Sequence, residues 1–289
     1  MTDLRNVLAR PAVAGAVRAL AVDRVTAEVV PALAAVGIRP ILLKGPSIAR
    51  WLYPSGGRSY GDTDLLVPPA DFAPAGSVLE DLGFLHLQRD WADGERPAHE
   101  TARAYRRSTC GRPSSVDLHR SLSVLTVADH VLWDAFAVGS GTLVVGGVEV
   151  AVLNTAALAL HIVLHAVQHG HAGHTGEDLR RLLDALPLEE WLPVADLAAR
   201  LGAGEGLAVG LGLVPEGEHI ARHLGLPAFS LDASAWGWGS PPAGRAWWRC
   251  SVPWAPLGRL WSECGGRWCR AWRRSGMSPD CPPLGPRRW

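Results

Sequence analysis

The spacing of apolar residues predicts an alternation of helices and strands in the first half of the chain. Apolar residues recur every three or four positions over residues 12–35, which predicts one or two amphipathic helices ending near Gly37. A short apolar run at 38–43 predicts a buried strand, and Pro46 favours the first turn of a helix over 47–52. Similar patterns predict strands at 62–67 and 84–88, a helix at 71–82, and hairpins at 101–118 (strands 101–110 and 115–118) and 142–153.

From Asn154 onward the pattern is helical. Asn154 or Thr155 can cap a helix that runs to about Gly170, and helices at 177–186, 190–201 and 205–224 follow. The chain therefore divides into an α+β unit at 1–153, a small helical domain at 154–228 and a remainder at 229–289.

The remainder has a different composition from the rest of the chain. Of 13 Trp residues, nine lie after residue 229, and the same segment interleaves them with nine Arg. Three interpretations stay open: a binder of anionic surfaces, a poorly ordered tail rich in Gly and Pro, or a shifted reading frame in a GC-rich gene.

Composition and charge narrow the class of protein. About half of the 289 residues are apolar and 19% are charged, which is typical of a globular protein. Arg or His interrupts every long apolar run, and no secretory signal pattern begins the chain, so we expect no transmembrane segment and a cytoplasmic location. The net charge is zero, yet 27 of the 28 basic residues are Arg and only one is Lys, at position 44.

Three aspartates on predicted strands form the first candidate site. In a strand alternate side chains share a face, so Asp62 and Asp64 would point the same way and Thr63 the opposite way. Asp117 lies in a second short strand with apolar neighbours. A solvated Asp-x-Asp loop is the common alternative, but strand-borne carboxylates are costly without a cation and can hold two divalent ions for attack on phosphorus.

The turn before the second predicted helix is suited to phosphate. Gly45 lets the backbone approach a ligand, Ser47 can donate a hydrogen bond, and Lys44 adds a compact positive charge. A plain turn with a solvated lysine is the alternative.

His161, His165 and His169 are spaced four residues apart, which places them along one helix face. Such a spacing can bind zinc, with Asp178 or Asp184 as a third ligand, which would make a metal hydrolase. The HExxH glutamate is absent, so a stripe that lines a cleft or packs in the interior is the favoured interpretation.

Together these segments resemble the uncharacterised nucleotidyltransferase family of the polymerase-β-like superfamily. The resemblance rests on Leu-Lys-Gly at 43–45, Leu-Tyr-Pro at 52–54, Arg58, Gly-Asp-Thr-Asp-Leu-Leu-Val at 61–67, Val-Asp-Leu-His at 116–119, the histidine helix and Leu-Arg-Arg-Leu-Leu-Asp at 179–184. It implies a mixed sheet with flanking helices, followed by the helical domain and the tail. It covers about residues 10–225.

The resemblance also implies an activity: metal-dependent transfer of a nucleoside monophosphate from a nucleoside triphosphate to a hydroxyl of an unknown small molecule, peptide or protein. Mg²⁺ or Mn²⁺ would be the cofactor. The implied roles are metal binding and catalysis for Asp62, Asp64 and Asp117, nucleotide binding for Lys44, Gly45, Ser47 and Arg58, and cleft or acceptor contacts for His119, His161, His165 and Asp184. A catalytically silent nucleotide-binding or antitoxin-like module of the same fold is the alternative, and nothing points to nucleic acid.

Overall fold

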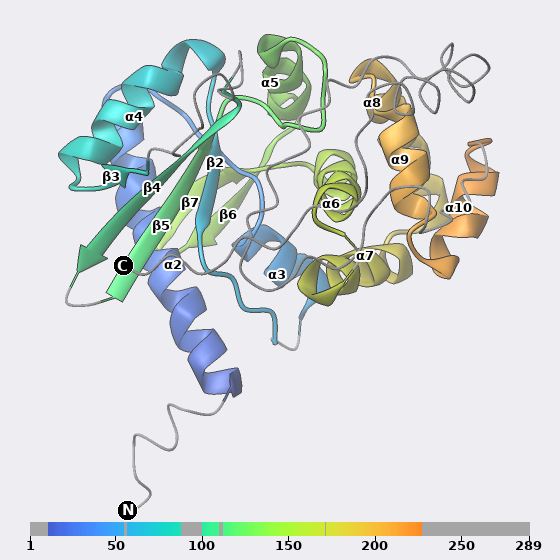
Figure 1. Ribbon diagram of the computed structural model, residues 1–289, viewed down its shortest axis with the longest axis horizontal. Coiled ribbons are helices and arrows are strands. Elements are labelled where there is room, and N and C mark those ends of the chain that lie inside the picture. Colours follow the sequence, from blue (N-terminus) through green and yellow to red (C-terminus); the bar gives the residue numbers. More distant parts are fainter. Residues whose placement is uncertain (1–10, 55–56, 88–99, 110–111, 171, 227–289) are drawn as a thin grey trace, which may run out of the picture. The chain divides into compact units, whose positions relative to one another are not determined.

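The computed structural model describes residues 11–54, 57–87, 100–109, 112–170 and 172–226 (Figure 1). The described residues all belong to one compact unit, and residues 241–289 lie outside the described part of the chain. The predicted tail at 229–289 therefore lies outside the described residues.

A mixed seven-stranded sheet is the centre of the unit, with strand order β3-β4-β5-β2-β1-β7-β6. β1 pairs antiparallel with β2 and parallel with β7, and β2 pairs parallel with β5. The pairs β3–β4, β4–β5 and β6–β7 are antiparallel. The strands are β1 (Ile41–Leu42), β2 (Thr63–Leu66), β3 (Leu85–His86), β4 (Ala102–Thr109), β5 (Arg112–His119), β6 (Gly141–Val145) and β7 (Val148–Val152).

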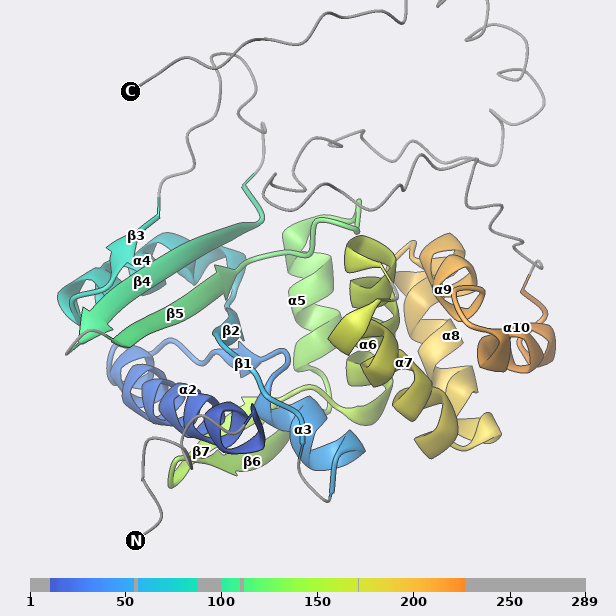
Figure 2. The ribbon, with the colours of Figure 1, turned by 60° about the horizontal axis from the view of Figure 1, so that its bottom comes forward.

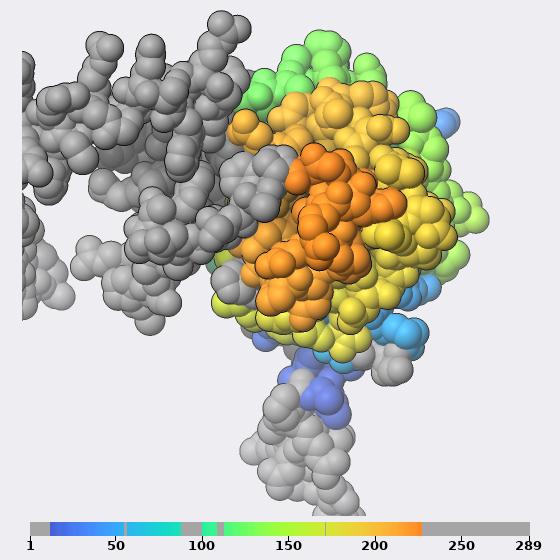
Figure 3. Space-filling view, turned by 90° about the vertical axis from the view of Figure 1, so that its right-hand side faces the viewer, coloured from blue at the N-terminus to red at the C-terminus, as the bar shows by residue number. Residues whose placement is uncertain are grey.

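Helices flank the sheet and continue into a helical region after β7 (Figure 2). The first helices are α2 (Pro11–Ala35), α3 (Pro46–Leu52), α4 (Phe72–Asp81) and α5 (Asp129–Ala137). The helical region comprises α6 (Thr155–His169), α7 (Gly173–Ala185), α8 (Trp191–Arg200), α9 (Gly204–Leu211) and α10 (Glu218–His223), of which α10 lies in orange on the face shown in Figure 3. Short 3-10 turns occur at η1 (Pro69–Asp71), η2 (Leu188–Glu190) and η3 (Pro215–Gly217).

Two hydrophobic clusters lie on the two faces of the sheet. The first joins α2 and α4 to one face and includes Val29 and Leu65, while the second joins α6–α10 to the other face and includes Leu66 and Leu160. Leu65 and Leu66 are fully buried on opposite faces, because side chains alternate along β2. The central strands are covered on both sides, which explains their continuous apolar run.

The predicted α+β class with a mixed sheet and flanking helices is confirmed, including the two hairpins. The β6–β7 turn occurs at Gly146 and Gly147, which both have positive φ. The first strand is shorter than the predicted 38–43, because only Ile41 and Leu42 pair with their neighbours. α5 corresponds to no predicted element.

The helical predictions hold at α6, where the side chain of Asn154 accepts a hydrogen bond from the amide of Ala157 at 2.9 Å. The single helix predicted at 205–224 is wrong, since α9 ends at Leu211 and α10 begins at Glu218. Pro215 explains the break, because proline removes a backbone donor and disfavours helical geometry in the residue before it.

No helix in the described part of the chain is both long enough and apolar enough to cross a membrane.

Candidate active site

Strands β2 and β5 bring two carboxylates together at the centre of the sheet. They are parallel neighbours in which Asp64 lies opposite Asp117 and Leu66 opposite His119. Thr63 points to the other face, where its hydroxyl lies 2.9 Å from that of Thr26 on α2. Asp64, Asp117 and His119 each offer a ligand atom, and these atoms lie within 4.8 Å of one another. The structure thus joins residues that are more than 50 positions apart.

Lys44 lies directly beside this carboxylate pair. Its Nζ is 3.2 Å from Oδ1 of Asp64, and Nε2 of His119 is 3.4 Å from the same oxygen. The turn carrying Lys44 follows β1, and the amide of Leu43 donates to the carbonyl of Asp64 at 3.0 Å. The side chain of Lys44 is 21% exposed and that of Asp64 only 2%, so the lysine charge borders solvent.

Burial and mutual repulsion separate the pKa values of the three carboxyl groups. Burial alone would raise the pKa of Asp64, but the charge of Lys44 and the contact with His119 outweigh it and hold that pKa below its usual range. Burial and the charge of Asp64 raise the pKa of Asp117 to about 6, and the same two causes raise that of Asp62. The pair formed by Asp64 and Asp117 is therefore electrostatically unfavourable without further positive charge.

The donor set fits a hard divalent cation. Oδ2 of Asp64 is buried and has no hydrogen-bond partner among the described residues, so an oxygen ligand is left over. Asp62 immediately precedes β2 and is partly exposed; strand alternation places it on the same face as Asp64. It lies outside the close group of three, whereas His119, predicted only as a cleft residue, lies inside it. Metal binding by these residues remains a prediction.

The Lys44–Gly45 turn has the backbone geometry that the sequence suggested. Gly45 has φ 72° and precedes α3, with Pro46 in the first helical turn. A Cβ at Gly45 would lie 3.5 Å from the ring of Tyr60, in ordinary contact, so the positive φ rather than crowding calls for glycine there. Arg58 reaches the carbonyl of this residue with Nη1, at 3.4 Å.

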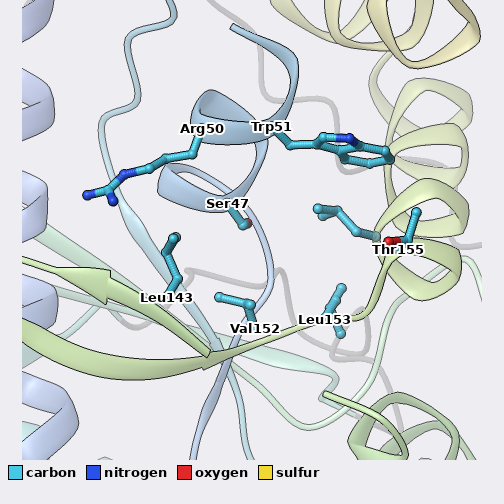
Figure 4. Close-up of a pocket in the computed structure, with 8 residues that line it drawn as sticks. Ser47, Arg50, Trp51, Leu143, Val152, Leu153 and Thr155 are labelled. Carbon is cyan, nitrogen blue, oxygen red and sulfur yellow. The ribbon is translucent and has the colours of Figure 1, made fainter. Parts of the chain in front are cut away.

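Ser47 lies beside a cavity of about 310 Å³ between α3, β7 and the start of α6 (Figure 4). Its Oγ is buried and has no hydrogen-bond partner among the described residues. Figure 4 shows Ser47 below α3, on the side of Val152 and Leu143. The other lining residues are Arg50, Trp51, Leu153, Thr155 and Leu158. The serine predicted to contact phosphate therefore borders a mostly apolar cavity.

Arg58 is engaged in a buried ion pair. Its Nε and Nη2 donate to the two carboxylate oxygens of Asp178 on α7, at 2.8 and 2.7 Å, and its side chain is 8% exposed. The hydroxyl of Tyr53 donates to the same carboxylate at 2.7 Å. The guanidinium predicted to bind phosphate thus binds protein groups here, and phosphate contact by Arg58 stays a prediction.

The histidines of α6 form a row on one face of the helix. The ring centroids of His161 and His165 are 6.0 Å apart, and those of His165 and His169 are 4.5 Å apart. His161 is 6% exposed, and neither ring nitrogen has a hydrogen-bond partner among the described residues. Burial, and after it the charge of Lys44, lowers the pKa of His161 to about 3, so the ring is neutral at neutral pH.

The zinc interpretation of this row lacks a third ligand. Within the described ranges, Asp64, Asp117 and His119 are the only group of three or more residues placed to hold a metal. Asp178 is bound to Arg58, and Asp184 is exposed on α7. A row that lines a cleft or packs in the interior stays the prediction for these histidines.

Sequence reasoning missed the role of Asp178 and the cavity beside α3. Asp178 was considered only as a zinc ligand, and its partner Arg58 lies 120 positions away, so no local pattern links them. Trp51 reads as an ordinary apolar helix position. The sequence offered one signal for this contact. Arg58 and Asp178 both lie close to motif residues, Arg58 just before 61–67 and Asp178 just before 179–184.

Comparison with known proteins identifies the family. A family described as uncharacterised nucleotidyltransferase matches residues 2–216, and the chain belongs to this family, as the sequence motifs predicted. Among solved structures, an antigenic nucleotidyltransferase-like protein from Paracoccidioides brasiliensis is 16% identical, with a TM-score of 0.41 over 72% of this chain and 94% of its own. The antibiotic-resistance factor ANT(2'')-Ia is 12% identical, with a TM-score of 0.41 over 63% and 94% of the two chains. No curated protein matches the chain.

Proposed function

We propose that this protein transfers a nucleoside monophosphate from a nucleoside triphosphate to the hydroxyl of an acceptor. The acceptor oxygen forms a bond to the α-phosphorus, the bond from that phosphorus to the bridging oxygen breaks, and pyrophosphate leaves. One observation carries the proposal: Asp64 and Asp117 lie opposite each other on adjacent parallel strands, with Lys44 3.2 Å from Asp64. Family membership supports it.

Asp64 and Asp117, with Asp62 beside them, would hold Mg²⁺ or Mn²⁺. When bound, such an ion neutralises the phosphate charge that develops during transfer. Asp64 is kept ionised by Lys44 and is therefore a permanent anionic ligand. Asp117, opposite Asp64, would also accept the proton of the acceptor hydroxyl.

The Lys44–Gly45 turn would hold the β- and γ-phosphates. Lys44 is a compact charge at the edge of the buried carboxylates, and Gly45 exposes backbone at a positive φ. Phosphate and carboxylate would then share Lys44, which keeps the leaving group close to Asp64. His161 and His165 would border the bound substrate as neutral hydrogen-bonding groups. Their role is tested by His161→Ala and His165→Ala, which should alter nucleotide or acceptor kinetics.

The test is pyrophosphate release in the presence of Mg²⁺, each of the four nucleoside triphosphates and a panel of hydroxyl acceptors. We expect release with the parent and a loss of at least about a hundredfold with Asp62→Ala/Asp64→Ala, because this variant removes two carboxylates that would hold the divalent ion, and with it the positive charge that positions the phosphates. Asp196→Asn, an exposed change on α8, is the matched control.

Two outcomes would contradict the mechanism. Turnover by the double variant at the parent rate would show that the carboxylates do not carry the reaction. Tight binding of nucleoside triphosphate without release of pyrophosphate, across the whole acceptor panel, would favour the silent nucleotide-binding module instead.

A further inference from the structure

Helix α7 contacts the short helix α3 at both of its ends. At the beginning of α3, Asp178 of α7 binds Arg58, and Arg58 donates from Nη1 to the carbonyl of Gly45 at 3.4 Å. At the end of α3, Arg181 donates to the carbonyl of Leu52 at 3.3 Å. These contacts from the helical region therefore hold α3, the helix that directly follows the Lys44–Gly45 turn.

The contact at Arg58 is specific in geometry. Nε and Nη2 form two parallel bonds of 2.8 and 2.7 Å to the carboxylate of Asp178, and the remaining nitrogen, Nη1, is directed at Gly45. Both side chains are nearly buried, at 8% and 3% exposure. Because the fork of a guanidinium is planar and rigid, fixing two of its nitrogens on Asp178 also fixes the direction of the third.

Further contacts orient the carboxylate of Asp178. Tyr53, at the end of α3, donates its hydroxyl to Oδ1 at 2.7 Å. The guanidinium of Arg181 lies 4.2 Å from the centroid of the Tyr53 ring and so restricts the ring from its other side. Asp178 is thus held by Arg58 and Tyr53, which both belong to the α+β part of the chain.

A contact at the carbonyl of Gly45 can restrict the conformation of the Lys44–Gly45 turn. It also accepts the amide of Ala49 at 3.0 Å, which is the first hydrogen bond of α3, and Gly45 itself has φ 72°. A glycine has many accessible backbone conformations, so a contact from a fixed side chain restricts the turn more than it would at another residue. Lys44, which pairs with Asp64, immediately precedes this glycine.

We propose that Asp178 is a positioning residue that acts through Arg58 on the carbonyl of Gly45 and so fixes the Lys44–Gly45 turn in its nucleotide-binding conformation. This proposal rests on the proposed function for its link to nucleotide binding. It makes α7 a part of the nucleotide site, although no atom of Asp178 needs to touch the nucleotide. It also gives Arg58 a role different from the phosphate contact that its sequence position suggested.

Two variants separate this role from simple support of the fold. Asp178→Asn keeps the shape and weakens the pairing with Arg58. Arg58→Met/Asp178→Leu removes both charges together, and apolar replacement of a whole buried ion pair is commonly tolerated by the fold where removal of one partner is not. The double variant therefore keeps the test available if the single variant does not fold. Asp196→Asn on α8 is the control.

The first measurement needs no nucleotide. Hydrogen exchange followed by mass spectrometry reports the amide of Ala49 and its neighbours in the peptide 44–50. We expect exchange of this peptide to be at least about tenfold faster in the folded variants than in the parent and the control. Parent-like exchange in a folded variant would overturn the proposal, because the turn would then be fixed without Asp178.

The second measurement is calorimetric titration with a non-hydrolysable triphosphate analogue and Mg²⁺. We expect a dissociation constant at least about tenfold higher for the folded variants, and a parent-like value for Asp196→Asn. Faster exchange with unchanged affinity would also overturn the proposal. If the parent binds no triphosphate, the proposed function fails, and the nucleotide part of this proposal fails with it. If the parent binds triphosphate and the variants bind it equally well, only the role of Asp178 is refuted.

Discussion

At the scale of the residue, Lys44 combines an unusual sequence position with a close contact in the candidate site. It is the single lysine in a chain with 27 arginines, and its ammonium lies 3.2 Å from the buried Oδ1 of Asp64. Burial lowers its pKa, but the charges of Asp64 and Asp62 outweigh that effect and raise it, so the ammonium stays charged. A planar guanidinium is wider than an ammonium and reaches further, so charge alone does not make the two interchangeable here.

We therefore expect Lys44→Arg to keep the charge and lose the fit. Affinity for a triphosphate analogue with Mg²⁺ should fall about tenfold, measured by calorimetric titration. Arg200→Lys, an exposed exchange of the same two side-chain types on α8, is the control. Arg50→Lys on α3 is unsuitable because Arg50 borders the cavity. Parent-like affinity of Lys44→Arg would show that any cation at this position suffices.

His161 gives a prediction about acid stability. Its pKa is lowered to about 3 in the folded protein, against about 6.5 in an unfolded chain. Above about pH 6.5 both states are neutral and the full stability is present; as the pH falls, only the unfolded chain binds the proton, so the free energy of unfolding decreases until about pH 3.

Urea unfolding at about pH 6.5 and about pH 5.5 measures this effect. Protonation of His161 in the unfolded chain alone lowers the free energy of unfolding by about 1 kcal/mol over that pH unit. His161→Leu should remove its share, so that the variant loses less stability than the parent between the two pH values. Equal losses in both proteins would mean that His161 is protonated in the folded state.

At the scale of the element, local patterns predicted most helices and both hairpins. Pro46 in the first turn of α3 and Asn154 before α6 act through the backbone next to them, and the structure places them as predicted. The prediction of one helix at 205–224 was wrong for a local reason as well. The apolar periodicity continues through Gly212 and Pro215, although the helix is interrupted there. Strand length was overestimated at β1, because pairing with two neighbours decides where a strand ends.

Asn154 offers a test of an element that carries site residues. Its Oδ1 accepts the amide of Ala157 at 2.9 Å, and its Nδ2 donates to the carbonyl of Val138 at 2.9 Å. Asn154→Ala should lower the free energy of unfolding by about 1–2 kcal/mol, measured by urea denaturation. Asn154→Asp keeps the cap and loses only the donor, so it should cost less; an equal cost would show that the contact with Val138 dominates.

At the scale of the whole molecule, the sheet brings candidate site residues from distant segments to one face. Lys44, Asp64, Asp117 and the histidines of α6 come from four segments, and the strand order β5-β2-β1 brings three of these segments side by side. The buried residues of the two clusters that cover the sheet lie between Val25 and Ala221 in the described part of the chain.

This arrangement predicts that removal of residues 241–289 leaves the described unit able to fold and bind nucleotide. The described residues all belong to one compact unit, which does not include residues 241–289. We expect the shortened chain to keep the melting temperature, measured by circular dichroism, and the affinity for the triphosphate analogue. Loss of affinity with an unchanged melting temperature would favour the anionic-surface interpretation of the Arg- and Trp-rich tail.

The sequence by itself determined most of the elements and the chemical types at the site. Periodicity predicted the α+β order, and the aspartates, Lys44 and Gly45 could be selected because each depends on neighbours within a few positions: alternation in a strand, a turn, a helix start. These are local properties of the backbone, so a single sequence contains them.

Only the tertiary structure decided which of these residues meet. The pairing of β2 with β5 set Asp64 opposite Asp117 and added His119, and the packing of α7 near α3 paired Arg58 with Asp178. Such contacts join residues 50 to 120 positions apart, and their energy depends on burial and relative orientation. Neither quantity is contained in the local pattern, because both arise only when the sheet and the helices have packed.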